Sequence, residues 1–304
     1  MTDVNQLLTE HLDIWTSAIE RKSGAGRGQS GGVSLYGIEK LRKLILELAM
    51  RGKLVEHEPA NVPGDDLVAS FERLRTKGIK DKRYKKQNIG EPLSKTELPF
   101  EIHPNWQWAR LGEIGFVFNG NSVSVRAKSE KYHSPEGLPF IATKNVGYGF
   151  EPIDYSVDAW IPCGEPKFKV ASARTPLICS EGGSAGKKCG LTDRDVCFGN
   201  KLFACDFYGD FLPEFLLAWY QTPSFFAQFS EKMTGIIGGI SLAKFLRLPV
   251  PVPPISEQHR IVSKVNELMA LCDSLERETK DSLKAHQTLV ETCLDAISCC
   301  QSAD

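Results

Sequence analysis

Residues 248–262 have the sequence Leu-Pro-Val-Pro-Val-Pro-Pro-Ile-Ser-Glu-Gln-His-Arg-Ile-Val, and they join two very different patterns. The four prolines exclude a helix before residue 255 and favour an extended chain. Ser256 is a good helix start, and Glu257 and Gln258 suit a first helical turn. The stretch therefore predicts a stiff joint between a compact domain and a long helix.

The predicted helix runs from 256 to 298 and carries a heptad pattern. Its apolar or small residues follow a 4-3-4-3 spacing from 261 to 296, which is typical of a coiled-coil seam. The middle of this seam is polar, at Thr279, Ser282 and His286, so we expect the helix to need a partner. The residues predicted to face a partner helix are Ile261, Val265, Leu268, Cys272, Leu275, Leu289 and Cys293.

The composition of the chain excludes several classes of protein. The 304 residues have room for about two domains, and the net charge of −1 does not indicate a globally basic nucleic-acid-binding protein. No apolar run approaches the ~18 residues of a membrane span, and the N-terminus is unlike a signal peptide, so we predict a cytoplasmic protein with no membrane partner. The nine cysteines form no Cys-x-x-Cys pair, so they predict buried apolar side chains and no metal site.

The residue composition and the predicted secondary structure of the chain change near Pro99. Before it, helical patterns are expected at 3–20, 38–52 and 64–78, with a Gly/Ser linker at 23–32. After it, short strands are expected at 116–118, 140–143, 175–179, 196–198 and 202–205. A helix is then expected at 213–220, with a continuation to 229 left open, and a short one at 242–246.

This order predicts a mixed α/β fold. An N-terminal helical region (1–98) precedes a β-rich α/β domain (99–252), which is followed by the long coiled-coil-type helix (253–304). The run Arg73–Lys86 holds eight basic residues and one acidic residue, Asp81. We interpret it as a solvated helix end, and contact with phosphates or with an acidic protein surface stays open as an alternative.

Motifs of catalysis are missing. Residues 181–188, Glu-Gly-Gly-Ser-Ala-Gly-Lys-Lys, resemble a phosphate-binding P-loop but have one residue too few between the glycines and Lys188 where a hydroxyl belongs. No Gly-x-Gly-x-x-Gly follows a predicted strand, and the six histidines lack metal-ligand spacing. The sequence therefore predicts a non-catalytic protein without a cofactor.

Several loops of the β-rich domain combine glycine, small hydroxyls, amides and lysine. Such residues let backbone N–H groups approach phosphates, add positive charge, and allow an asparagine to form two hydrogen bonds with adenine. Taken one at a time, each loop is more readily interpreted as an ordinary turn of a β-rich domain. The loops are 119–122, 143–145, 180–188, 200–201 and 234–241.

Together these segments resemble the DNA specificity subunit of type I restriction–modification enzymes. The resemblance is carried by Trp106–Ile114, Pro139–Val146, Ile178–Lys187 and the run from Gly239 to Ile261, over roughly residues 100–280. Its most specific part is the Pro-Pro-Ile-Ser-Glu-Gln block that enters the long helix. Residues 37–54 also resemble the N-terminal helical region of one group of these subunits.

The resemblance implies a target recognition domain that binds one half of a bipartite site in double-stranded DNA. It implies that the long helix is a spacer, and that methyltransferase and restriction-translocase subunits are partners while the subunit itself catalyses nothing. Such subunits carry two recognition domains and this chain has room for one, so we expect a fragment or a half-subunit that self-associates through its helix. The target sequence is not predictable, because specificity lies in individual loop side chains.

From residue type and loop position we predict which residues bind DNA. The side chains predicted to make contact are Asn119, Asn121, Ser122, Thr143, Lys144, Asn145, Ser184, Lys187, Lys188, Asn200 and Lys201, with backbone approaches at Gly238, Gly239 and Ser241. Two other functions stay open. One is a protein–protein adaptor acting through the coiled coil, and the other is a phosphate-ester or nucleotide-binding enzyme that uses the 181–188 loop.

Overall fold

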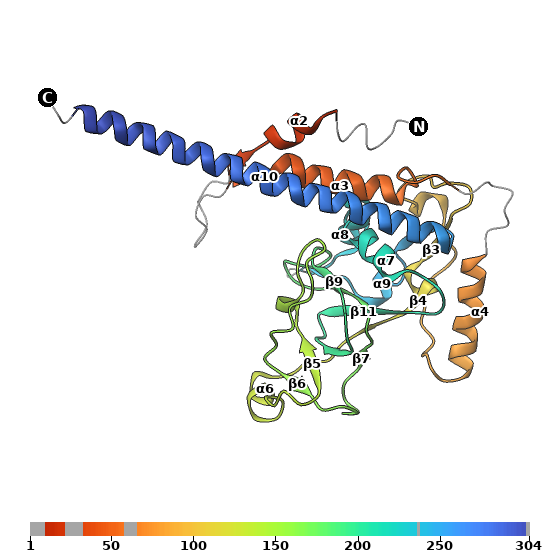
Figure 1. Cartoon of the computed structure of the whole chain (residues 1–304). Helices are drawn as coiled ribbons and strands as arrows, with labels where there is room; N and C mark the ends of the chain where they lie inside the picture. The colour runs from red at the N-terminus through yellow and green to blue at the C-terminus, as the bar shows by residue number, and fades with distance from the viewer. Residues whose placement is uncertain (1–9, 22–32, 58–65, 236–237, 302–304) are drawn as a thin grey trace. The chain divides into compact units, whose positions relative to one another are not determined.

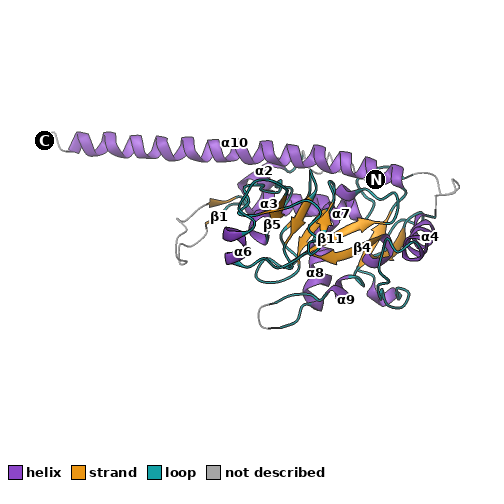
Figure 2. Cartoon of the chain, turned by 90° about the horizontal axis from the view of Figure 1, so that it is seen from below, coloured by secondary structure: helices purple, strands orange, loops and turns teal. Residues whose placement is uncertain are grey.

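The computed structural model describes residues 10–21, 33–57, 66–235 and 238–301 (Figure 1). They have the expected mixed α/β character, with several small sheets and one long C-terminal helix (Figure 2). The chain divides into two compact units, one from 1–45 with 263–304 and the other from 46–262. The domain limits proposed above, between residues 98 and 99 and between 252 and 253, were drawn from changes in residue composition and stay a prediction.

The first unit is built on a helix pair. Helix α3 (Tyr36–Met50) and helix α10 (Ile255–Gln301) run alongside each other in opposite directions (Figure 1). Arg42 of α3 donates to the carboxylates of Asp273 at 2.7 Å and Glu276 at 3.0 Å. Those contacts hold the two helices together, and the Lys280 and Arg42 side chains lower the pKa of Glu276.

The N-terminal segment is shorter in the structure than the predicted helix over 3–20. Helix α2 spans Leu12–Ser17 and is followed by a small antiparallel pair, β1 (Glu20–Arg21) with β2 (Val33–Ser34). The rest of that prediction, residues 3–9, and the linker at 23–32 lie outside the described residues.

The predicted seam residues of α10 differ in burial between the first and last parts of the helix. Ile261, Val265, Leu268 and Cys272 are all buried, and Leu275 is half-buried. Leu289 and Cys293 are exposed. The heptad pattern therefore predicted the long helix, and the contact of its seam with a partner helix stays a prediction.

The second unit contains two four-stranded sheets among its described residues. One has the order β6-β5-β10-β7 and the other β4-β11-β8-β9. The bounds are β4 Gly115–Asn119, β5 Leu138–Ile141, β6 Trp160–Ile161, β7 Val170–Ala171, β8 Pro176–Cys179, β9 Cys189–Leu191, β10 Val196–Phe198 and β11 Leu202–Phe207. The helices are α4 Leu67–Lys80, α5 Leu111–Ile114, α6 Val125–Glu130, α7 Pro213–Tyr220, α8 Pro223–Lys232 and α9 Leu242–Phe245. The expected strands are therefore present.

The helix expected at 213–220 is confirmed as α7, and the continuation to 229 that was left open is a separate helix. The pattern from 213 towards 229 forms two helices, α7 and α8, because Pro223 cannot continue the hydrogen-bond ladder of α7. The hydroxyl of Thr222 instead caps α8 by accepting from the N–H of Phe225 at 3.0 Å.

The proline joint forms an edge strand. Strand β12 (Pro249–Val252) pairs antiparallel with β3 (Gln107–Arg110), with Pro249 opposite Arg110. Alternate prolines suit this position because every second N–H of an edge strand faces away from its partner. The joint is thus part of the second unit and is not a free linker.

The first turn of α10 is anchored by two buried polar side chains. Oε1 of Glu257 accepts from Nδ1 of His57 at 2.5 Å, and His57 stacks on His103. The amide oxygen of Gln258 accepts from the N–H of Leu212 at 2.9 Å, and its Nε2 donates to Pro253. These contacts explain why Glu and Gln follow the prolines.

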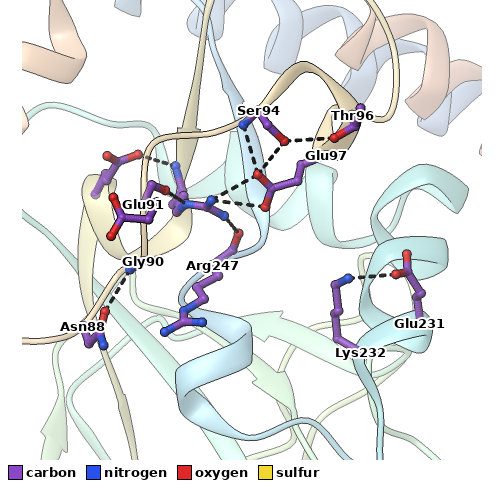
Figure 3. Close-up of polar contacts among 11 residues, drawn as sticks. Asn88, Gly90, Glu91, Ser94, Thr96, Glu97, Glu231, Lys232 and Arg247 are labelled. Carbon is purple, nitrogen blue, oxygen red and sulfur yellow. Dashed lines mark hydrogen bonds and ion pairs between the residues drawn. The ribbon is translucent and has the colours of Figure 1, made fainter.

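Arg110 connects the proline joint with residues 91–97, which precede the four-stranded sheets. Its guanidinium donates to the carbonyl oxygens of Glu91 (2.8 Å) and Arg247 (2.7 Å) and to both carboxylate oxygens of Glu97 (Figure 3). The side chain of Arg110 is only 6% exposed. Hydrogen bonds from Ser94, together with Arg110, lower the pKa of Glu97.

Candidate nucleic-acid interface

Strand register brings separate loops to one end of the β4-β11-β8-β9 sheet. Asn119 at the end of β4 lies opposite Phe203 near the start of β11, and Leu202 lies opposite Cys179 at the end of β8. Cys189, the first residue of β9, pairs with Ile178. The loops 119–122, 180–188 and 199–201 therefore meet at this end.

The other four-stranded sheet adds a fourth loop. Strand β10 runs parallel to β5, and the N–H of Gly199 donates to the carbonyl of Ile141 at 2.9 Å. A bridge between Tyr148 and Lys188 then links the loop after β5 to the 180–188 loop. Residues 143–148 thus join the same end.

The last predicted loop is held there by backbone hydrogen bonds. The N–H of Gly182 donates to Gly238 at 2.8 Å, and the N–H of Ile240 donates to Ser180 at 2.9 Å. We call the segments 119–122, 143–148, 180–188, 199–201 and 238–241 the loop cluster. All of the predicted DNA-binding residues lie in it.

Side chains in the loop cluster differ in their availability. Asn145 is buried, its Oδ1 accepts from the N–H of Ala142 at 3.0 Å, and its Nδ2 donates to Ser156 at 3.4 Å. Lys144 forms an ion pair with Asp158, and Lys201 forms one with Glu181 at 3.4 Å. Asn145 therefore serves the loop's own structure.

Lysines at the outer face of the 180–188 loop lie over aromatic rings. The Nζ of Lys187 is 5.7 Å from the centre of the Phe226 ring, and that of Lys188 is 5.1 Å from the Tyr148 ring. Such cation–π contacts orient the ammonium groups without neutralising them.

The remaining predicted residues are accessible to different degrees. Ser122, Asn200 and Ser241 are exposed, and Thr143, Ser184, Gly238 and Gly239 are half-buried. Ser241 also caps α9 by accepting from the N–H of Lys244.

The 181–188 loop lacks the geometry of a P-loop. The N–H groups of residues 182 and 185–188 all donate to backbone carbonyls, so they are not turned towards a ligand. Strand β9 follows the loop, whereas a P-loop leads into a helix. This geometry argues against nucleotide hydrolysis.

The cysteines of the sheets are buried thiols. Burial raises the pKa of Cys179 and of Cys197 to about 11, and that of Cys189 to about 12. Within the described ranges, no group of three or more His, Cys, Asp or Glu side chains is placed to hold a metal ion. Nor is any helix in the described part of the chain long and apolar enough to cross a membrane.

Sequence analysis missed three residues in or beside the loop cluster. Tyr148 and Phe150 are 51% and 40% exposed, and exposed aromatic rings next to lysines suit contact with nucleic acid. Lys169 donates to Asn119, as described below. The pattern Tyr-Gly-Phe at 148–150 was a usable signal, whereas nothing near Lys169 in sequence indicates its contact with Asn119, 50 positions away.

Gly120 allows the close approach on which the 119–122 loop depends. A Cβ at this position would lie 1.9 Å from the carbonyl oxygen of Phe198. We expect Gly120→Ala to lower the free energy of unfolding by about 2 kcal/mol, because the loop must move away from β10. Urea unfolding measures this loss.

Gly183→Ala is the matched control for Gly120→Ala. No heavy atom lies within 4 Å of a Cβ built at Gly183, in the same loop cluster. Its effect is expected within about 0.5 kcal/mol. Equal unfolding midpoints for the two variants would show that the 119–122 loop does not need the close approach.

Comparisons with known proteins agree with this architecture. A family model described as the type I restriction modification DNA specificity domain matches residues 104–285. The specificity subunits of the type I restriction enzymes EcoAI and EcoEI from Escherichia coli are 34% and 33% identical to this chain. Each alignment covers 99% of this chain and 51% of the relative, so the chain spans about half the length of these relatives.

Solved structures are similar at a lower level. The HsdS subunit from Thermoanaerobacter tengcongensis has a TM-score of 0.45 and 19% identity, over 88% of this chain and 62% of that one. The S subunit of a type I system from M. genitalium has a TM-score of 0.45 and 13% identity, over 91% and 55%. Because the family model covers both four-stranded sheets, the whole loop cluster, the proline joint and α10 as far as residue 285, this chain belongs to the family of type I restriction modification DNA specificity domains.

Proposed function

We propose that this chain is a non-catalytic DNA-recognition component of a type I restriction–modification enzyme, and that its loop cluster contacts one half of a bipartite target. The observation that carries the proposal is the convergence of the loops at one sheet end, through the pairs Asn119–Phe203 and Leu202–Cys179. Membership of the specificity family supports it. Backbone groups and lysines would position the DNA, and exposed amides and hydroxyls would contact bases.

The partners belong to the same proposal. The relatives are named specificity subunits of type I restriction enzymes, so we propose that methyltransferase subunits and, through them, restriction-translocase subunits bind this chain in the cytoplasm, where the DNA lies. The chain itself would supply recognition, since the 181–188 loop does not form a phosphate cradle.

Helix α10 fits the role of a spacer. Its 47 residues give a length of about 70 Å at ~1.5 Å per residue, or about two turns of B-DNA. Near its end Leu289 is 60% exposed and Ile297 is 57% exposed, with Cys293 between them on the same face. We call the exposed face formed by Leu289, Cys293 and Ile297 the ridge. We propose that a second helix, from another copy or from another recognition half, covers it.

A single charge on the ridge tests this partner helix. We expect Leu289→Glu to weaken self-association of the chain about 20-fold, because an exposed leucine would otherwise be buried at the helix pair. Sedimentation equilibrium measures the association constant. The control is Gln287→Glu, which adds the same charge two residues away; equal effects of both variants would contradict a contact at Leu289.

Selection from a pool of random-sequence duplexes tests DNA recognition. We expect the full chain to enrich one short half-site, and Asn200→Ala to weaken or shift that preference. Binding without any enriched sequence, while the chain still captures methyltransferase subunits, would favour the adaptor alternative.

A further inference from the structure

The basic run Arg73–Lys86 extends past α4 and follows the edge of a sheet. Nε2 of Gln87 donates to the carbonyl of Val117 at 2.6 Å, and Oε1 of Gln87 accepts from the N–H of Val117 at 3.3 Å. The side-chain amide thus takes the place of a neighbouring strand beside β4. Tyr84 packs against Phe116 of the same strand, with ring centres 5.5 Å apart. These contacts fix the end of the run along β4, which leads into the loop cluster.

Lys169 is held at the same place by asparagine oxygens. Its Nζ donates to the backbone carbonyl of Asn119 at 2.7 Å and to Oδ1 of Asn119 at 3.1 Å. Its backbone N–H donates to Oδ1 of Asn121 at 3.0 Å. The ammonium is therefore oriented by neutral acceptors, which leave its charge in place.

Lys85 belongs to the segment held along β4, two residues before Gln87. Burial and the positive charge of Lys85 lower the pKa of Lys169. In the described part of the chain neither lysine forms an ion pair with a carboxylate, and the carboxylate of Asp206 lies 4.0 Å from Arg83. Because the charge of Lys85 disfavours that of Lys169, an anion bound by both lysines would remove this cost.

We infer that Lys85 and Lys169 form a binding site for a phosphodiester group of DNA at the β4 side of the loop cluster. This inference rests on the proposed function and extends the DNA interface to a segment that precedes the β-rich domain. Asn119 and Asn121 are then positioning residues that hold Lys169 against a phosphate. They contribute to affinity for every DNA sequence, whereas Asn200 contributes to sequence preference.

Salt dependence of binding tests the site, with the full chain and a mixed-sequence 30-base-pair duplex as the probe. Each phosphate contact adds about 0.9 to the slope of log affinity against log salt. We expect Lys85→Gln and Lys169→Gln each to reduce the slope by about 0.9 and to weaken binding about eightfold at 0.1 M salt. Asn119→Ala should lower affinity for all duplexes and leave the enriched half-site unchanged.

Lys77→Gln is the matched control, because Lys77 is an exposed lysine of the same basic run on α4. We expect its slope to equal that of the parent chain, with thermal melting confirming that all variants are folded. If the parent binds and the Lys85 and Lys169 variants keep its slope, or if Lys77→Gln lowers it equally, the phosphate site is wrong and the proposed function stands. If the parent binds no duplex even at low salt, both fail.

Discussion

Arg110→Ala is expected to lower the free energy of unfolding by about 3 kcal/mol, the largest loss of stability expected from one substitution here. The guanidinium of Arg110 joins three segments, through the carbonyls of Glu91 and Arg247 and the carboxylate of Glu97. Alanine would leave these acceptors without their donor and would open a gap beside the proline joint. Urea unfolding should show a lower midpoint with an unchanged slope.

Two variants make the Arg110 prediction specific. Arg110→Lys keeps the charge but cannot bridge three acceptors, so its loss should be intermediate. Arg126→Ala removes an arginine whose side chain is 83% exposed and pairs with Glu130 on α6, and its effect should stay below about 0.5 kcal/mol. An Arg110→Ala midpoint equal to that of Arg126→Ala would mean that the three-way contact does not stabilise the joint.

Reversing the charges of Lys187 and Lys188 is the second large effect. If each lysine meets one phosphate, the double variant Lys187→Glu/Lys188→Glu loses two contacts and binds mixed-sequence duplex about 60-fold more weakly at 0.1 M salt. The loss should be the same for all DNA sequences, because phosphates carry no base information. Fluorescence anisotropy over a salt series measures both the affinity and the slope.

The matched control places the same charge change at the opposite end of the sheet. Arg174 precedes β8 and Arg194 follows β9, and both are exposed. Arg174→Glu/Arg194→Glu alters the net charge as much as the lysine double variant does. Equal losses of affinity would indicate an effect of overall charge and would argue against the 180–188 loop as the contact.

Local sequence rules predicted the elements of this fold well. The prolines at 249–254 and the heptad spacing predicted the joint and α10, since both depend on residues close in sequence. The break between α7 and α8 was also visible, because Pro223 cannot continue a helix. A continuation of α7 to 229 stayed open because the apolar pattern continues through the proline.

The site was predictable in its parts and not in its arrangement. Composition marked each loop, but only strand register places residues 119, 180 and 200 at one sheet end, and register depends on distant pairings. Individual roles were hidden for the same reason. Nothing near Asn145 in sequence indicates that its amide bonds to Ser156, and Lys85 and Lys169 are 84 positions apart.

Site-specific photocrosslinking tests most directly the central claim that the loop cluster contacts DNA. A photocrosslinking amino acid would replace Asn200, which is exposed in the loop cluster, or Ala173, which is exposed near the opposite end of the sheet. We predict that the protein with the probe at 200 forms a covalent adduct with duplex DNA, and that the protein with the probe at 173 does not. Adducts formed from position 173 and not from position 200 would contradict the account.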